Sequence, residues 1–252
     1  MLFNSYEFIF IFLPIVLLGF LFLGSLGRYQ IAIAWLVFSS LFFYGWWNPI
    51  YLILIISSVI FNYFIGIFIT NKSQKKLGFI LLTIGVLANL GLLGYFKYAN
   101  FLIDNWNIAF ETEYNLKAII LPLAISFFTF QQIAYLVDTY RAETEEHNFL
   151  YYALFITFFP QLIAGPIVHH KEMLPQFLKA SIFKLNHKHL SVGIMIFSIG
   201  LFKKVVFADT MASYATPVFN AANEGITLTF FEAWGGGTCV FPAIIFRLFW
   251  LF

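Results

Sequence analysis

The sequence is 252 residues long, and it is 61% hydrophobic, 21% aromatic and only 10% charged. A soluble domain carries roughly 25% charged residues, so this chain cannot cover itself with a hydrated surface. Together with a mean hydropathy of +0.86, this composition predicts an all-α polytopic membrane protein whose first partner is the lipid bilayer. The net charge of +2 is too small to indicate nucleic-acid binding, and a single cysteine excludes an internal disulfide.

Apolar stretches of about 20 residues, the length that crosses a bilayer core of roughly 30 Å, recur along the chain. The first has no basic flank and no small-residue cleavage site, so it is predicted to be a retained helix. The last is followed by residues 208–234, which mix polar and aromatic positions around Pro217. Lys203 and Lys204 are interpreted as side chains that reach the membrane surface. The predicted spans are 7–24, 30–45, 50–69, 77–97, 118–137, 149–164 and 189–207.

Lysines in the loops predict the orientation of the spans. Residues 72–76 and 165–188 are both lysine-rich, so both loops are expected on the cytoplasmic side. Three crossing spans between them would place them on opposite sides. The segment 149–164 is short, and its Pro160 and Gln161 are expected to break a helix at membrane depth. We therefore predict that 149–164 is a re-entrant segment.

The segment 121–141 carries a polar stripe. At 100° per residue, Gln131, Gln132, Tyr135 and Asp138 fall within about 120° of one another on a helix. Because polar groups in lipid are costly, the stripe should face the bundle interior or a wet cavity. Two interpretations stay open, namely hydrogen bonds that fix helix packing and the wall of a substrate tunnel.

A second polar cluster lies in residues 158–177. His169 and His170 follow a Gly-Pro break, so they are candidates for acid–base chemistry or for binding an anionic headgroup. Adjacent histidines point to different faces of a helix, and neither His187 nor His189 completes a recognised ligand spacing. We therefore expect no metal site.

Several stretches, in this order, resemble the N-terminal half of a bacterial membrane-bound O-acyltransferase (MBOAT) of the alginate O-acetyltransferase type. The resemblance covers residues 1–236, and its last two stretches are the most specific. The stretches are MLFNSYEFIFIFLPIV, FFYGWWNPIYLILIISSVIFNYFIG, YFKYANFLIDN, LPLAISFFTFQQIAYLVDTYR and FFPQLIAGPIVHHKEMLPQF.

The resemblance implies a partial MBOAT-like helical bundle in the bacterial cytoplasmic (inner) membrane, pierced by a tunnel. It implies transfer of an acetyl group from a donor such as acetyl-CoA, or another acetyl carrier, to an exported polysaccharide such as alginate. Periplasmic or secreted acetylation partners are implied as well, and no cofactor is expected to stay bound. A polytopic transporter or channel subunit is the alternative. The candidate tunnel or substrate-path residues are Gln131, Gln132, Tyr135, Asp138, Gln161, His169 and His170.

Residues 237–252 depart from the family pattern. In the family, EAW is commonly followed by a stretch like ALAYTLQLYFDFSGYSDMA, with the catalytic histidine after it. Here EAW (232–234) is followed by GGGTCVFPAIIFRLFWLF, and none of the five histidines occupies the catalytic position. We interpret 237–252 as a frameshifted, non-native tail and expect this chain to be an inactive fragment. The alternative is a genuine, divergent final helix.

Overall fold

The computed structural model describes residues 1–70, 75–112, 114, 119–143, 148–162 and 170–248, with side chains up to Val240 except those of residues 75, 170–172 and 180. The described residues contain helices and no strand, which confirms the all-α class. The chain divides into two compact units, unit 1 with residues 1–163 and 167–184 and unit 2 with residues 164–166 and 185–252. By length and composition, four of the described helical stretches can cross a membrane: Phe8–Ser25, Ile50–Thr70, Lys76–Phe110 and His187–Asn223.

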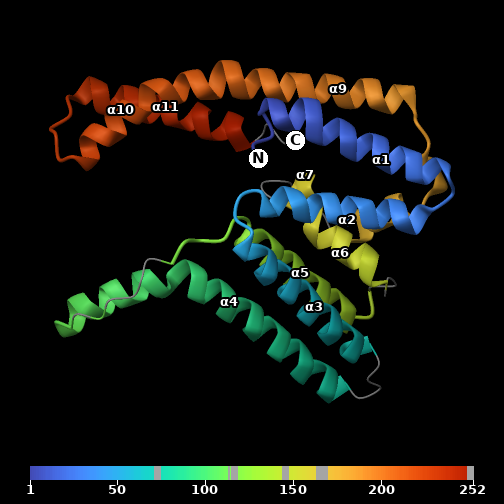
Figure 1. Ribbon diagram of the computed structural model, residues 1–252. Coiled ribbons are helices and arrows are strands. Elements are labelled where there is room, and N and C mark those ends of the chain that lie inside the picture. The colour runs from blue at the N-terminus through green and yellow to red at the C-terminus, as the bar shows by residue number, and fades with distance from the viewer. Residues whose placement is uncertain (71–74, 113, 115–118, 144–147, 163–169, 249–252) are drawn as a thin grey trace. The chain divides into compact units, whose positions relative to one another are not determined.

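Unit 1 begins with consecutive helices that reverse direction (Figure 1). A π-helical turn η1 (Phe8–Phe12) leads into α1 (Leu13–Ser25), and α2 (Tyr29–Gly45) packs back against it. Gly19 permits the close approach, because a Cβ there would lie 2.6 Å from Trp35 Nε1. The Trp35 indole donates to Val16 O at 3.1 Å and so ties the two helices together.

Helices α3 (Ile50–Thr70), α4 (Lys75–Phe110) and α5 (Ile125–Tyr140) lie side by side in unit 1 (Figure 1). The predicted span 77–97 was too short, since α4 has 36 residues and is about 54 Å long. The predicted helix 118–137 began too early, because residues 119–124 are not helical.

Pro122 explains the late start of α5, since proline lacks a donor and biases the preceding residue towards an extended backbone. Two tyrosine hydroxyls satisfy carbonyls that the missing helix leaves free. Tyr51 donates to Ile120 O at 2.7 Å, and Tyr44 donates to Leu123 O at 3.0 Å. Non-helical backbone at this position is therefore hydrogen-bonded to protein, as membrane depth requires.

The segment 149–164 is broken, as predicted, but the break lies earlier than expected. Helix α6 (Phe149–Thr157) ends before Phe158, whose backbone is not helical, and the short α7 (Phe159–Leu162) follows. Pro160 is the second residue of α7, where its missing N–H costs nothing, so proline ends the first helix and fits the start of the next.

One end of unit 1 is rich in basic residues. Phe183, in the 3₁₀ turn η2 (Ala180–Phe183), stacks on Tyr29 with ring centroids 4.5 Å apart, which brings the chain back to the α1–α2 turn. Since α1, α2 and α3 alternate in direction, this is also the end at which α3 stops and α4 begins (Figure 1). Tyr140, at the end of α5, lies beside Phe79 with ring centroids 6.3 Å apart, so α5 also ends here. The described chain is thus at this end both before α6 and at η2, and the re-entrant segment stays a prediction. This end carries Arg28, Lys75, Lys76, Arg141 and Lys184.

Unit 2 is a long helical rod with one helix packed against it. The predicted span 189–207 was too short, because α9 (His187–Phe202), the π-helical turn η3 (Lys203–Ala208) and α10 (Asp209–Asn223) follow without a break. Helix α11 (Phe230–Leu248) turns back and packs on α10 and η3 (Figure 1). At Gly236 the two helices are close, since a Cβ there would meet Val218 Cγ1 at 2.8 Å.

Candidate functional site

Helix α5 carries the candidate site, and its polar stripe is buried as predicted. The exposed fractions are 4% for Gln131, 0% for Gln132, 3% for Tyr135 and 8% for Asp138. Helices α3, α4 and α6 pack around α5, so its polar positions cannot face lipid. Gln132 contacts α3, and Tyr135 contacts both α3 and α6.

Gln132 joins α5 to α3. Its Oε1 accepts from Ser58 Oγ at 2.7 Å and from Asn62 Nδ2 at 2.9 Å, and all three side chains are buried. Gln132 Nε2 is also buried and has no hydrogen-bond partner among the described residues. Its carbonyl oxygen thus serves two hydrogen bonds between helices, as the packing interpretation expects, and a place in a tunnel wall stays a prediction.

Asn62 joins the same network to α4. Its Nδ2 donates to Asn89 Oδ1 at 3.2 Å, and Asn89 Nδ2 donates back to Asn62 Oδ1 at 2.6 Å. Each asparagine also donates to the carbonyl four residues earlier in its own helix, which are Ser58 and Gly85. Three helices are thus held by side-chain amides in an otherwise apolar region, where such bonds average about 0.6 kcal/mol each.

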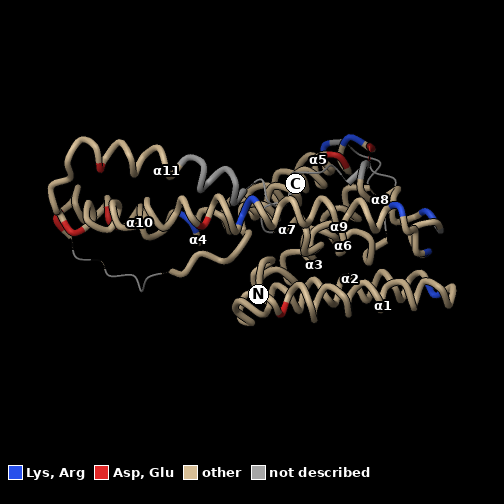
Figure 2. The backbone as a smooth tube through the Cα atoms, turned by 90° about the horizontal axis from the view of Figure 1, so that it is seen from above, with Lys and Arg blue, Asp and Glu red and all other residues tan. Residues whose placement is uncertain are grey.

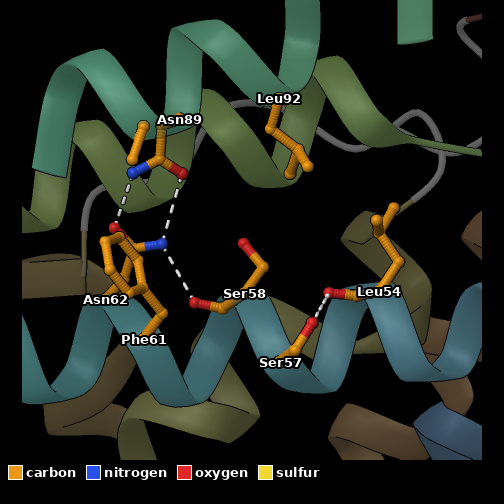
Figure 3. A pocket seen from close by; sticks show the side chains of 8 residues that line it. Leu54, Ser57, Ser58, Phe61, Asn62, Asn89 and Leu92 are labelled. Atoms are coloured by element: carbon orange, nitrogen blue, oxygen red, sulfur yellow. Dashed lines mark hydrogen bonds between the residues drawn. The ribbon is translucent and has the colours of Figure 1, made fainter. Parts of the chain in front are cut away.

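A pocket of about 280 Å³ lies beside this network, between α3 and α4 (Figure 3). Ser58, Asn62 and Asn89 give it a polar wall, and the remaining wall is mostly apolar. Amides and hydroxyls donate and accept hydrogen bonds but do not take up a proton at neutral pH, so this wall can hold a polar group without acting as a base. The other lining residues are Leu54, Ser57, Phe61, Ala88 and Leu92.

A different part of α5 carries polar atoms whose partners are not seen. Gln131 Oε1 and Thr129 Oγ1 are buried and have no hydrogen-bond partner among the described residues. The same holds for the hydroxyl of Tyr152 in α6, whose ring lies 4.3 Å from that of Tyr135. Buried polar atoms are nearly always paired, so such atoms indicate places where water or a ligand binds.

Tyr135 packs closely against α3, because a Cβ on Gly66 would lie 2.8 Å from its ring. Asp138 lies one turn further along α5, and its backbone carbonyl accepts from Glu143 N at 2.9 Å. Tyr135 and Asp138 therefore extend the buried face of α5 towards the basic end of unit 1.

Gln161 has a definite structural partner. Its Nε2 donates to Phe155 O at 2.8 Å and so satisfies a carbonyl at the end of α6. On the other side of the break, Phe159 N donates to Ser40 Oγ in α2 at 3.2 Å. The rings of Phe8, Phe12 and Phe43 surround Phe159, which fixes α7 against α1 and α2.

His169 lies outside the described residues. His170 begins α8 (His170–Phe177), and its side chain also lies outside the described part. The site proposed for the two histidines stays a prediction.

Sequence reasoning missed Ser58, Asn62 and Asn89. A signal was present, since Ser58 and Asn62 are four residues apart in an apolar span and so share one helix face. Asn89 is likewise an isolated amide within an apolar span. Polar side chains inside a membrane segment indicate a partner on another helix.

Comparison with known proteins gives a consistent result. The model of the membrane-bound O-acyltransferase family matches residues 81–229. The chain is 44% identical to the peptidoglycan O-acetyltransferase of Helicobacter pylori, over 93% of this chain and 49% of that protein. It is 37% identical to a probable alginate O-acetylase of Pseudomonas aeruginosa, over 94% of this chain and 44% of that protein.

A probable alginate O-acetylase of Azotobacter vinelandii is 35% identical, over 94% of this chain and 46% of that protein. The chain thus spans about half the length of the curated relatives it matches. No solved structure matches it.

Proposed function

Because the chain belongs to the membrane-bound O-acyltransferase family, we propose that it contributes the N-terminal part of an enzyme that acetylates hydroxyl groups of an exported polysaccharide. The observation that carries the proposal is the family match over residues 81–229, together with relatives named as O-acetyltransferases. It favours this function over a transporter or channel subunit, which the sequence alone left open. The enzyme would be a multi-pass protein of the bacterial inner membrane.

The relatives suggest the acceptor. The higher identity belongs to a peptidoglycan O-acetyltransferase, at 44%, against 37% for a probable alginate O-acetylase. We therefore take peptidoglycan as the first acceptor to test and alginate as the second. The acetyl donor in this proposal is acetyl-CoA or another acetyl carrier, and the acceptor side involves periplasmic or secreted acetylation partners.

The buried face of α5 suits the wall of an acyl path. In this proposal Gln131 contacts the path, because its Oε1 is buried with no hydrogen-bond partner among the described residues. Gln132 supports the wall from behind through α3 and α4. Acetylating a hydroxyl requires a base, and the amide network holds none, so we assign the base to the other half of the enzyme. The remaining path candidates are Tyr135, Asp138, Gln161, His169 and His170.

A chimera tests the proposal. Residues 1–236 of this chain would replace the matching half of the Helicobacter pylori protein and, in a second arm, of the Pseudomonas aeruginosa protein. We expect O-acetyl groups to return to peptidoglycan in the first arm, measured by ester release and mass spectrometry. The control is each relative's other half expressed alone. Chimeras that insert into the membrane but acetylate neither polymer would overturn the proposal.

A further inference from the structure

The rod of unit 2 has charged residues at its middle. Between residues 190 and 223, only Lys203, Lys204 and Asp209 are charged. Figure 2 shows how sparse charged positions are along the described chain as a whole. The π-helical turn η3 (Lys203–Ala208) contains the two lysines and ends directly before the aspartate.

The π-helical turn makes an ion pair possible that an α-helix would not allow. Lys204 Nζ lies 2.5 Å from Asp209 Oδ2. Residues five apart lie about 140° apart around an α-helix of 3.6 residues per turn, on different faces. A π-helical turn has i to i+5 hydrogen bonds, so it brings such residues onto nearly one face. Lys204 is therefore paired within the rod. That it reaches the membrane surface stays a prediction.

These charges cannot avoid the membrane if the rod crosses it. The rod His187–Asn223 has 37 residues, and about 20 are needed to cross the bilayer core. Every 20-residue stretch of the rod contains Lys204, and every stretch except the last contains Lys203. Charged residues at this depth are costly and usually mark a functional site.

Of the three charged residues, only Lys203 is outside the Lys204–Asp209 ion pair. Its side chain is exposed, and no ion pair of Lys203 is seen among the described side chains. The apolar side chains around it are also exposed, with 54% for Phe202, 47% for Val205 and 44% for Val206. An unpaired ammonium next to exposed apolar surface fits a ligand that carries both a negative head and an apolar chain.

We propose that η3 binds the phosphate headgroup of an anionic lipid, with Lys203 as the cation that contacts the phosphate. Lysine binds phosphate as a compact point charge, and a lipid phosphate is the anion that reaches a lysine from within a membrane. The Lys204–Asp209 pair contributes no net charge, so the charge of the site is that of Lys203. The exposed Phe202, Val205 and Val206 would contact the acyl chains. This binding is independent of the acetyl transfer proposed above.

The test uses the full 252-residue chain in vesicles of equal parts phosphatidylglycerol and phosphatidylcholine. The protein is extracted in mild detergent, and the retained lipids are counted by mass spectrometry. We expect roughly fivefold enrichment of phosphatidylglycerol, the effect of one basic residue near an anionic lipid. Lys203→Gln should remove the enrichment, Lys203→Arg should keep it, and Lys188→Gln, at an exposed lysine of the same rod, is the matched control.

Circular dichroism of each variant checks that the helices are intact. Equal enrichment in the parent chain and Lys203→Gln, or no enrichment in the parent chain, would overturn the proposal. Displacement of phosphatidylglycerol by inorganic phosphate, but not by the same concentration of chloride, would overturn the lipid assignment and indicate a site for a soluble phosphate.

Discussion

Gln131 and Gln132 are neighbours on α5 with different surroundings. Gln132 Oε1 accepts two hydrogen bonds from α3, whereas Gln131 Oε1 is buried with no hydrogen-bond partner among the described residues. Burial alone therefore does not tell a packing residue from a residue that contacts a ligand. The two glutamines differ at the side-chain oxygen, since Gln132 Nε2 also has no hydrogen-bond partner among the described residues.

Substitutions of Gln131 and Gln132 give a matched test of the two roles. Gln132→Leu should destabilise the fold by about 1–3 kcal/mol, because Ser58 Oγ and Asn62 Nδ2 lose a buried acceptor. Gln131→Leu should leave stability nearly unchanged and lower acetyl transfer of the chimera roughly tenfold, the loss of one polar contact. Thermal unfolding in detergent and O-acetyl release measure the two effects. Equal loss of folded protein and of activity in both variants would contradict the path role of Gln131.

Glu232 stabilises the first turn of α11 through a capping box with Thr229. Glu232 Oε2 accepts from Thr229 N at 2.8 Å, and Glu232 N donates to Thr229 Oγ1 at 3.3 Å. The hydrogen bonds from the Thr229 backbone and hydroxyl hold the pKa of the Glu232 carboxyl below its ordinary value of 4.5. A lowered pKa means that the stabilisation is present above the unfolded pKa and is lost as the pH falls through the folded one.

We therefore expect the first turn of α11 to fray below about pH 4.5, the ordinary value of this carboxyl. Amide hydrogen exchange of residues 230–234 should lose protection there in the parent chain. In Glu232→Gln, the protection of these amides should not change with pH once the intrinsic exchange rate at each pH is divided out. A parent chain and variant with the same pH profile would rule out the carboxylate as the cause.

At the element scale, the break in 149–164 shows how a membrane protein supports non-helical backbone. Pro160 ends α6 because it cannot donate to a carbonyl one turn earlier. Gln161 and Ser40 then satisfy Phe155 O and Phe159 N. The break is thus a position fixed by three helices, and its flanking rings are buried.

The distribution of basic residues predicts the orientation of unit 1. Its basic end carries Arg28, Lys76 and Arg141, so it should be cytoplasmic. With Cys239→Ser as background, cysteines at Ser73 and Ser181 should react with an impermeant maleimide only from the cytoplasmic face. Thr112→Cys, beyond the far end of α4, should react only from outside. Labelling of Ser73→Cys and Ser181→Cys from opposite faces would exclude the re-entrant segment.

For the whole molecule, hydropathy predicted that these helices exist, but it predicted the ends of only some of them. The spans 7–24, 30–45 and 50–69 agree with the structure within one or two residues, because residues with glycine, proline or polar side chains follow them in the sequence. The ends of α4 and α10 lie beyond the apolar stretches, since a helix can continue into water when its own hydrogen bonds are kept. Hydropathy measures burial in lipid and does not detect such extensions.

The candidate site was predicted only in part, for a similar reason. Periodicity placed Gln132 on a buried face, yet its partners Ser58 and Asn62 lie 74 and 70 residues away in sequence, and Asn89 joins the network through Asn62. Helical periodicity describes one element, whereas the network depends on how three elements pack. The resemblance supplied the family, and the comparisons confirmed it.

Residues 237–252 give the last prediction, that this tail is read in the wrong frame. The structure forms a helix over 230–248, but three consecutive glycines, 235–237, cost about 1 kcal/mol each there. Gly236 has a packing reason in Val218, whereas a Cβ on Gly237 would have nothing within 4 Å. Relatives match 93–94% of the chain, so a small part of it has no counterpart in them.

The codons allow the family motif one nucleotide later. Each shifted codon consists of the last two bases of one codon and the first base of the next. Trp250 is TGG and the Leu251 codon begins with T or C, so the shifted codon is GGT or GGC, which encodes Gly. Arg247 as CGN, followed by Leu248, permits a shifted codon for Asp. Continuing in this way, 237–251 permits ALAYSLQLYFDFSGY without a gap, where the family has ALAYTLQLYFDFSGY. Sequencing the gene around codon 237 and several hundred bases beyond decides the matter. We expect the +1 frame to read this motif and to stay open, whereas a stop codon or an unrelated frame would establish a genuine final helix.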